Sequence, residues 1–269
     1  CLMQKLNISK YHLIGHDFGA YVSSYLCLLT PKNILSLTLM SMPFPGTPTL
    51  TNINNMLRMN QKLALLKPKR KHYQYYFSSY NANKNIMECK QGLNNFLRSY
   101  FYFKSYDYKG NNPFKLKSFT AKEISKMPEY YIMKLNLGMA QTVIKYSPTQ
   151  IESSKCTWLN EHDLGYYVRN YLKSGIKKPL SWYRVMLSKK DKLKIIKLKL
   201  PTSIYIPSIF ISGSADWGMY QKPGDLEKME NVFFKNYYGR FIIKQAGHWV
   251  QQEQPNKTFD LILQFLKKI

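Results

Sequence analysis

The stretch Tyr11-His-Leu-Ile-Gly-His-Asp17-Phe-Gly-Ala-Tyr-Val joins a short apolar run to a helix-like segment that stops at Thr30-Pro31. The turn between them reads Gly-x-Asp-x-Gly, with Asp17 at its centre. A strand that turns sharply into a helix needs glycine where the chain is crowded, and the turn lifts one side chain towards the helix N-terminus. The side chain presented here is a carboxylate, which indicates a nucleophile that forms an alkyl ester. A glycine-flanked turn with a helix-capping Asp gives the same short pattern, so the motif alone leaves both interpretations open.

Length and composition favour a folded globular protein. The chain has 269 residues, of which 45% are hydrophobic. This length suits one α/β domain of the larger kind with an insertion, and this hydrophobic content is enough to build a core. No apolar run approaches the roughly 18 residues that a membrane-spanning helix requires. We therefore expect no transmembrane segment.

The cysteines argue against a metal or disulfide scaffold. They stand at positions 1, 27, 89 and 156, with no Cys-x-x-Cys pair and no histidine at ligand spacing. This pattern is typical of a reducing compartment, so we expect a cytoplasmic protein. Cys27 lies inside the helix-like segment after Asp17 and is expected to be a core residue.

The chain is strongly basic, with 40 Lys and Arg against 15 Asp and Glu and a formal net charge of +25. Such an excess attracts polyanions, including nucleic acids and acidic membranes. The lysines are spread along the chain, with short clusters at Lys67–Lys71 and Lys189–Lys199. Lys, Asn, Ile and Tyr are abundant together, as an AT-rich coding bias produces. We expect weak attraction to polyanions and no specific nucleic-acid partner.

Short apolar runs bounded by Gly or Pro gather near the two ends of the chain, and helix patterns lie between and after them. The strands are predicted at Tyr11–Gly15, Ile34–Met40, Ser208–Ser212 and Arg240–Lys244, and the helices at Ala20–Leu29, Pro223–Phe234 and Lys257–Lys268. Strands that are apolar along their whole length are typical of sheets buried on both faces. Their alternation with helices indicates an α/β fold with a parallel sheet.

The middle of the chain, residues 51–198, has a different pattern. Helix-length segments are separated by Asn, Gly and Pro, Tyr and Met are frequent, and no convincing strand is visible. We interpret this region as a helical insertion between two strands of the sheet. The expected organisation is a first core segment (1–50), the insertion (51–198) and a second core segment (199–269).

Two further polar residues follow predicted strands. Asp216 lies just beyond the strand Ser208–Ser212, and His248 stands after the last strand and before the last helix. Functional groups of open parallel sheets gather at the carboxyl ends of the strands. Nucleophile, acid, histidine is the order of catalytic triads in α/β-hydrolases. Singly, Asp216 also fits a turn cap and His248 a packed polar residue, but three such residues at three strand ends favour a catalytic site.

Five segments make the chain resemble the soluble epoxide hydrolase family of α/β-hydrolases. They are His16-Asp17-Phe18-Gly19, Asp216-Trp-Gly-Met-Tyr-Gln-Lys-Pro-Gly, Gly-His248-Trp-Val-Gln-Gln-Glu-Gln-Pro and, inside the insertion, Tyr73-Gln74-Tyr75-Tyr76-Phe77 and Leu180-Ser-Trp182-Tyr183-Arg184. The resemblance covers nearly the whole chain. It implies a partial α/β-hydrolase parallel sheet with a helical cap, formed by residues 51–198.

The resemblance implies a two-step addition of water to an epoxide. Asp17 is the implied nucleophile, and His248, oriented by Asp216, is the implied base that activates water. Tyr73 and Tyr183 match the family positions that bind the epoxide oxygen, where phenol O–H groups stabilise or protonate an alkoxide. The product is a vicinal diol, the partners are a small epoxide and water, and no cofactor and no metal are implied.

The same resemblance supplies further site residues. The backbone N–H of Phe18 is the implied oxyanion donor, and Phe18, Trp182 and Trp217 are the implied substrate contacts. The chain has 22 tyrosines, so composition alone could not select Tyr73 and Tyr183. Without the motif matches, core packing is the simpler interpretation of both.

One departure from the family bears on activity. The family carries a His-Gly-x-Pro turn upstream of the nucleophile, which supplies a second oxyanion donor, and this sequence contains none. The sequence opens only ten residues before its first predicted strand. We therefore expect an N-terminally truncated family member, and an inactive fragment is one of the alternatives.

Two other functions stay open. A haloalkane dehalogenase also uses Asp and His on this fold, but it usually has Trp after the nucleophile to hold the halide, whereas this chain has Phe18. A non-catalytic protein, either a decayed fragment or a basic binding module, is favoured by the missing turn and opposed by the intact triad. A serine esterase is disfavoured because the elbow residue is Asp17.

Overall fold

A four-stranded, fully parallel sheet organises the first of the two units into which the chain divides. The computed structural model describes residues 2–269, so Cys1 lies outside the described residues. The first unit comprises Cys1–Thr47, Pro113–Lys115 and Lys199–Ile269. Its strands are β1 (Tyr11–His16), β2 (Ile34–Met40), β5 (Ser208–Gly213) and β6 (Tyr237–Ile243), and they lie in the order β1-β2-β5-β6.

The predicted parallel sheet is confirmed. β2 has the predicted bounds because its run ILSLTLM is apolar almost throughout, and six of its seven residues are buried. β6 begins at Tyr237 rather than at Arg240, since Tyr237 pairs with Ser208 of β5 although this part of the strand is not continuously apolar.

Helices and helical turns connect the strands of the first unit. They are α1 (Leu2–Lys5), α2 (Phe18–Leu29), η1 (Pro31–Asn33), η3 (Gly218–Tyr220), α13 (Asp225–Lys228), η4 (Met229–Phe233), α14 (Val250–Glu253) and α15 (Pro255–Lys268). The single helix predicted over Pro223–Phe234 is wrong in detail. Gly224 has a left-handed conformation with φ 87°, which delays the helix to Asp225, and Met229–Phe233 form a wider π-helical turn, η4.

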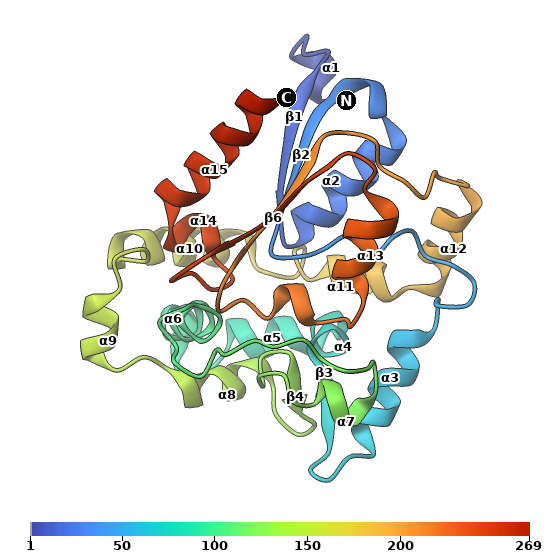
Figure 1. Ribbon diagram of the computed structural model, residues 1–269. Helices are drawn as coiled ribbons and strands as arrows, with labels where there is room; N and C mark the ends of the chain where they lie inside the picture. Colours follow the sequence, from blue (N-terminus) through green and yellow to red (C-terminus); the bar gives the residue numbers. More distant parts are fainter. Residues whose placement is uncertain (1) are drawn as a thin grey trace. The chain divides into compact units, whose positions relative to one another are not determined.

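Each face of the sheet has its own buried cluster. Leu37, Leu39 and Phe210 pack with side chains of α2 and α13 on one face, and Ile209 and Ile211 pack with side chains of α15 on the other. Figure 1 shows these helices on opposite sides of the strands. Complete burial of such a side chain contributes about 1.5–3 kcal/mol. Burial on both faces is the physical reason for the continuously apolar strands.

β1, which leads into the predicted nucleophile, is an edge strand among the strands described for residues 2–269. Its ladder hydrogen bonds run to β2 alone, and the side chain of Ile14 is 51% exposed. On its other face, Leu13 packs against the cluster that contains α2. The elbow strand is therefore held by β2 and by its own helix.

Helices make up most of the second unit, Pro48–Asn112 and Leu116–Leu198. They are α3 (Asn55–Ala64), α4 (Tyr73–Ser78), α5 (Asn81–Met87), α6 (Gly92–Lys104), α7 (Ala121–Ile124), α8 (Met139–Val143), η2 (Ile144–Tyr146), α9 (Gln150–Lys155), α10 (Glu161–Ser174), α11 (Ser181–Leu187) and α12 (Lys189–Lys197). Across residues 2–269, no helix combines the length and the hydrophobicity needed to span a bilayer.

The second unit also holds a small antiparallel sheet of β3 (Arg70–His72) and β4 (Ile132–Lys134). The expectation that residues 51–198 contain no strand is therefore wrong at these two places. Strands of three residues are too short to show an alternating pattern in the sequence. The pairing matters locally, because β3 runs directly into α4, which begins at Tyr73.

The two units divide near the positions expected for a core with an insertion. The first boundary lies after Thr47 rather than after residue 50, and the return lies at Lys199. The segment Pro113–Lys115 also belongs to the first unit, where the Phe114 ring meets Trp217 at 5.0 Å. No pattern in the sequence indicates that these three residues belong to the first unit. The assignment of the second unit as a cap stays a prediction.

Candidate active site

Asp17 occupies the sharp turn between β1 and α2. Its backbone has φ 52° and ψ −111°, a conformation that residues with a side chain rarely adopt, and α2 begins at the next residue, Phe18. The Asp17 N–H donates to the backbone oxygen of Met40 over 3.1 Å. A strained residue at a strand-to-helix turn is the geometry of a nucleophile elbow, since it holds the side chain clear of the sheet.

The two glycines of the elbow have different roles. A Cβ on Gly15 would lie 2.3 Å from the backbone oxygen of Gly19 and 2.7 Å from the Ser23 hydroxyl, so only glycine fits there. A Cβ on Gly19 would meet nothing within 4 Å. The expectation that both glycines of the turn are crowded is therefore wrong for Gly19. The carbonyl of Gly19 comes close to the Cα of Gly15, but the space beside the Cα of Gly19 itself is open.

His248 lies between the other two residues of the predicted triad. Its Nε2 is 3.2 Å from Asp17 Oδ2, and its Nδ1 is 3.2 Å from Asp216 Oδ1. The side chains of His248 and Asp216 are 2% and 1% exposed, whereas that of Asp17 is 27% exposed. The structure therefore brings these residues from three strand ends into one line. If Asp216 accepts the Nδ1–H, the Nε2 lone pair faces the Asp17 side, where a base is needed.

Asp216 is fully enclosed by hydrogen-bond donors. Its Oδ1 accepts the Gly218 N–H at 2.7 Å, and its Oδ2 accepts the Ser212 hydroxyl at 3.2 Å. Burial alone would raise the pKa of the Asp216 carboxyl, but the charge of His248 and the hydrogen bonds from His248 and the Gly218 N–H hold it below its ordinary value. A Cβ on Gly218 would lie 2.9 Å from Asp216 Oδ1, so glycine lets this N–H approach the carboxylate.

His16, directly before Asp17, is a neutral group beside the triad. Its Nε2 lies 2.7 Å from the backbone oxygen of His248, and the two imidazole rings lie 5.0 Å apart. Burial, and then the neighbouring His248, lower the pKa of His16 from 6.5 to about 4. At neutral pH the His16 ring is therefore uncharged and donates its Nε2–H to that carbonyl.

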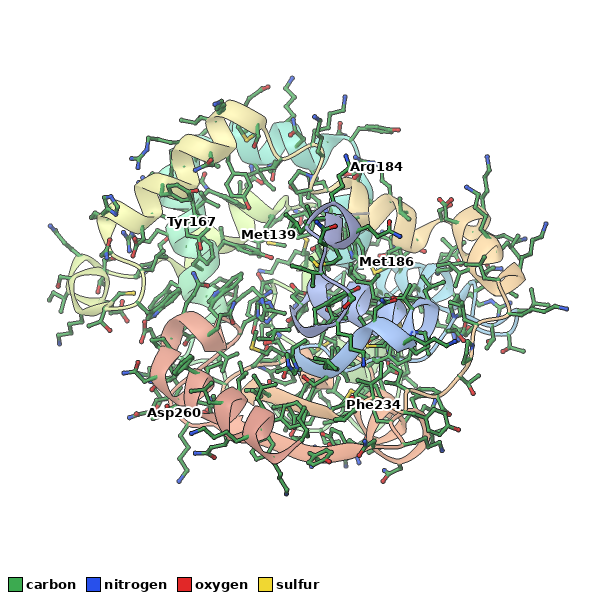
Figure 2. All side chains as sticks on the ribbon, turned by 90° about the horizontal axis from the view of Figure 1, so that it is seen from above. Met139, Tyr167, Arg184, Met186, Phe234 and Asp260 are labelled. Atoms are coloured by element: carbon green, nitrogen blue, oxygen red, sulfur yellow. The ribbon has the colours of Figure 1, made fainter. Side chains whose placement is uncertain are left out.

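Tyr73 and Tyr183 lie together in the second unit. Tyr73 is the first residue of α4, and Tyr183 lies in α11, the helix that also carries Arg184 and Met186, which Figure 2 labels. The two tyrosine side chains are buried, and their ring centroids are 5.8 Å apart with the rings nearly perpendicular. The structure therefore pairs the two predicted tyrosines, although they stand more than a hundred residues apart in the chain.

The predicted substrate contacts lie next to these groups in each unit. Phe18 opens α2 directly after Asp17, and Trp182 is half-buried beside Tyr183. Trp217 follows Asp216 and is buried, and its indole Nε1 has no hydrogen-bond partner among residues 2–269. Their role in binding substrate stays a prediction.

Sequence reasoning missed the residues that hold the His248 loop. Besides His16, the hydroxyl of Ser41 donates to the His248 carbonyl at 3.1 Å, and the Glu253 carboxylate accepts backbone N–H groups on both sides of His248. Glu253 lies inside the motif that follows His248, and Ser41 follows the β2 run, so both were visible as polar residues near strand ends.

In the part of the chain that the structure describes, no group of three His, Cys, Asp or Glu side chains could hold a metal ion.

Comparison with known proteins assigns the chain to a family. A family model described as alpha/beta hydrolase fold matches residues 1–255. The chain belongs to the α/β-hydrolase fold family. The predicted fold class, an α/β-hydrolase parallel sheet with helical elements, is thereby confirmed.

Relatives of this α/β-hydrolase include proteins named epoxide hydrolase. The chain is 27% identical over 266 residues to epoxide hydrolase B of Mycobacterium tuberculosis, covering 94% of this chain and 71% of that protein. It is 22% identical over 281 residues to epoxide hydrolase 3 of Siraitia grosvenorii, covering 99% and 72%. The solved structure of an epoxide hydrolase from an endophytic Streptomyces matches with a TM-score of 0.75 at 20% identity, covering 99% of this chain and 70% of that one. The resemblance seen in the motifs is confirmed.

The elbow geometry makes a prediction about Gly15→Ala and Gly19→Ala. We expect Gly15→Ala to lower the free energy of unfolding by at least the roughly 1–3 kcal/mol typical of overpacking, because backbone atoms cannot move aside. Gly19→Ala should cause no loss, since its methyl group enters open space within a helix that favours alanine. Urea denaturation of the two variants measures the difference. Equal stabilities would contradict the elbow described here.

Proposed function

We propose that this α/β-hydrolase is an epoxide hydrolase that converts an epoxide and water into a vicinal diol through an ester on Asp17. The observation that carries the proposal is a carboxylate at the strained elbow, with His248 Nε2 3.2 Å from it. A carboxylate can attack an electrophilic carbon and then be freed when water attacks its own carbonyl carbon. The relatives named epoxide hydrolase support the same reaction.

In the first half-reaction, an oxygen of Asp17 attacks a ring carbon of the epoxide. The new ester bond forms while the ring carbon–oxygen bond breaks, and the ring oxygen keeps the electron pair. Tyr73 and Tyr183 donate hydrogen bonds to this oxygen, and one of them supplies a proton. The contact between the two rings, whose centroids are 5.8 Å apart, supports a joint role, because it brings both side chains into one region of the second unit.

In the second half-reaction, His248 takes a proton from water, and the resulting hydroxide attacks the carbonyl carbon of the Asp17 ester. The backbone N–H of Phe18 donates to the oxyanion, and collapse breaks the bond to the product oxygen, which takes the proton from His248. The proton left on the Asp17 carboxyl returns to the ionised tyrosine. The lowered pKa of Asp216 supports this step, because an ionised acid stabilises the imidazolium that forms.

The oxyanion arrangement bears on which half-reaction is slow. The 269-residue sequence has no His-Gly-x-Pro turn, so Phe18 is the one donor that the motifs supply. Loss of one such donor typically lowers a rate by about 10²–10³. The tetrahedral oxyanion exists only in the second half-reaction. An oxyanion donor therefore bears on release of the ester and not on its formation.

Phe18 also separates this proposal from a haloalkane dehalogenase. Haloalkane dehalogenases usually have Trp at that position, where its indole N–H holds the halide, and the phenyl ring of Phe18 has no such donor. The intact triad, with its buried acid and its aligned histidine, opposes a purely non-catalytic role.

Trapping the ester tests the proposed function. With His248→Gln, the first half-reaction should proceed and the second should stop, because no base activates water. Intact-mass analysis after addition of an aryl epoxide should show the protein heavier by one substrate, and the extra Asp17→Ala substitution should remove the adduct. A His248→Gln variant that never gains this mass, while the wild-type protein consumes the epoxide, would rule out the ester.

The tyrosine pair makes a separate prediction. Tyr73→Phe and Tyr183→Phe keep the ring and remove only the hydroxyl, so ester formation should slow by one or more orders of magnitude while the melting temperature changes little. Tyr76→Phe is the matched control: it lies in the same helix and its hydroxyl donates to Asn85. Rapid-quench measurement of ester formation gives the rates. Unchanged ester formation together with lost stability in the first two variants would make them structural residues.

A further inference from the structure

The loop that carries His248 is fixed by one carboxylate that reaches both of its neighbours. Glu253, at the end of α14, accepts the N–H of Gly247 on Oε2 at 2.9 Å and the N–H of Trp249 on Oε1 at 3.0 Å. These two amides flank His248 on either side. Hydrogen bonds to an ionised acceptor are roughly twice as strong as neutral ones. Glu253 therefore holds the backbone on both sides of His248.

The carbonyl of His248 is held from the opposite side. It accepts the His16 Nε2–H at 2.7 Å and the Ser41 hydroxyl at 3.1 Å. Ser41 stands just after β2 with φ 68°, and its N–H donates to the backbone oxygen of Ile211 at 2.9 Å, which ties it to the neighbouring strand β5. The three successive residues Gly247, His248 and Trp249 thus have backbone groups bound to side chains from β1, from the end of β2 and from α14.

This arrangement matters because the imidazole must serve two partners at once. His248 lies 3.2 Å from both Asp17 and Asp216, so a shift towards either one lengthens the other contact. The adjacent Trp249 ring packs edge-on against the imidazole at 4.8 Å, and the backbone N–H of this residue is one of the two that Glu253 binds. A misplacement of about 1 Å lowers a rate by up to about 10².

We propose that Glu253 is a positioning residue for His248, acting through the Gly247 and Trp249 amides. Both of its carboxylate oxygens accept these backbone amides, so it acts on the imidazole through the loop. This inference rests on the proposed function, which gives His248 a role only in release of the ester. Loss of the Glu253 carboxylate should therefore slow the second half-reaction and not the first. A simple helix cap, the other role open to a carboxylate at this place, would stabilise α14 without this selectivity.

The test compares Glu253→Gln with Asp260→Asn in single-turnover experiments on an aryl epoxide. Gln keeps one accepting oxygen and turns an NH₂ group towards a backbone N–H, whereas Asp260 is an exposed carboxylate on α15 (Figure 2). In Glu253→Gln, ester formation should stay within about twofold of wild type, and ester hydrolysis should slow about tenfold to a hundredfold. Glu253→Asp, which keeps both oxygens on a shorter side chain, should recover part of the rate, and Asp260→Asn should match wild type.

A second readout does not depend on the reaction. The Nδ1–H proton shared by His248 and Asp216 gives a low-field proton resonance, which should shift or broaden in Glu253→Gln and stay unchanged in Asp260→Asn. Glu253→Asp, which keeps the carboxylate, should shift the resonance less than Glu253→Gln does, and it covers a Glu253→Gln variant that does not fold.

The outcomes separate the two proposals. Unchanged hydrolysis and an unchanged resonance in Glu253→Gln would overturn the positioning role, as would an equal fall of both half-reactions that follows the melting temperature. If the wild-type protein forms no ester at all, the proposed function fails, and the resonance alone then decides whether Glu253 positions His248.

Discussion

The contact between the buried Asp216 carboxylate and His248 is the constraint on which the rest of the site depends. A carboxylate that is 1% exposed is stable only when its oxygens are hydrogen-bonded. Gly218, Ser212 and His248 meet this need. Although burial raises the pKa of Asp216, the charge and hydrogen bond of His248 and the Gly218 N–H hold it below its ordinary value. An ionised Asp216 in turn keeps the proton of the imidazole on Nδ1, so that Nε2 faces Asp17. Asp216 therefore orients the imidazole of His248, and His248 in turn faces Asp17 with its Nε2.

The parallel sheet brings Asp17, His248 and Asp216 together at the ends of its strands. It also holds two residues with strained backbones close to them. Asp17 after β1 and Ser41 after β2 both have positive φ values without being glycine. Such backbones cost on the order of 1–3 kcal/mol each and persist only where surrounding contacts determine them. Here neighbouring strands supply those contacts. The Asp17 N–H donates to the backbone oxygen of Met40 in β2, and the Ser41 N–H donates to the backbone oxygen of Ile211 in β5. These backbones place the Asp17 carboxylate beside His248 Nε2 and the Ser41 hydroxyl against the His248 carbonyl.

Much of this could be predicted from the sequence because burial and chain order leave clear marks. The apolar run of β2 fixed its bounds, and the order of Asp17, Asp216 and His248 indicated the triad. Two kinds of feature left no mark. The strands β3 and β4 are too short for a pattern, and the role of Glu253 depends on two backbone N–H groups whose direction no residue type encodes. The tyrosine pair was found through motif resemblance, since its members meet only in the folded chain.

The central claim is that the oxygen added to the epoxide comes from a protein carboxylate. A single turnover in oxygen-18 water, with enzyme in excess over an aryl epoxide, tests it most directly. The first diol released should carry unlabelled oxygen, because its new oxygen is drawn from Asp17, and the label should remain in the protein at that residue. Later turnovers should then release labelled diol. Oxygen-18 in the diol of the first turnover, with none in Asp17, would contradict the ester and indicate direct attack by water.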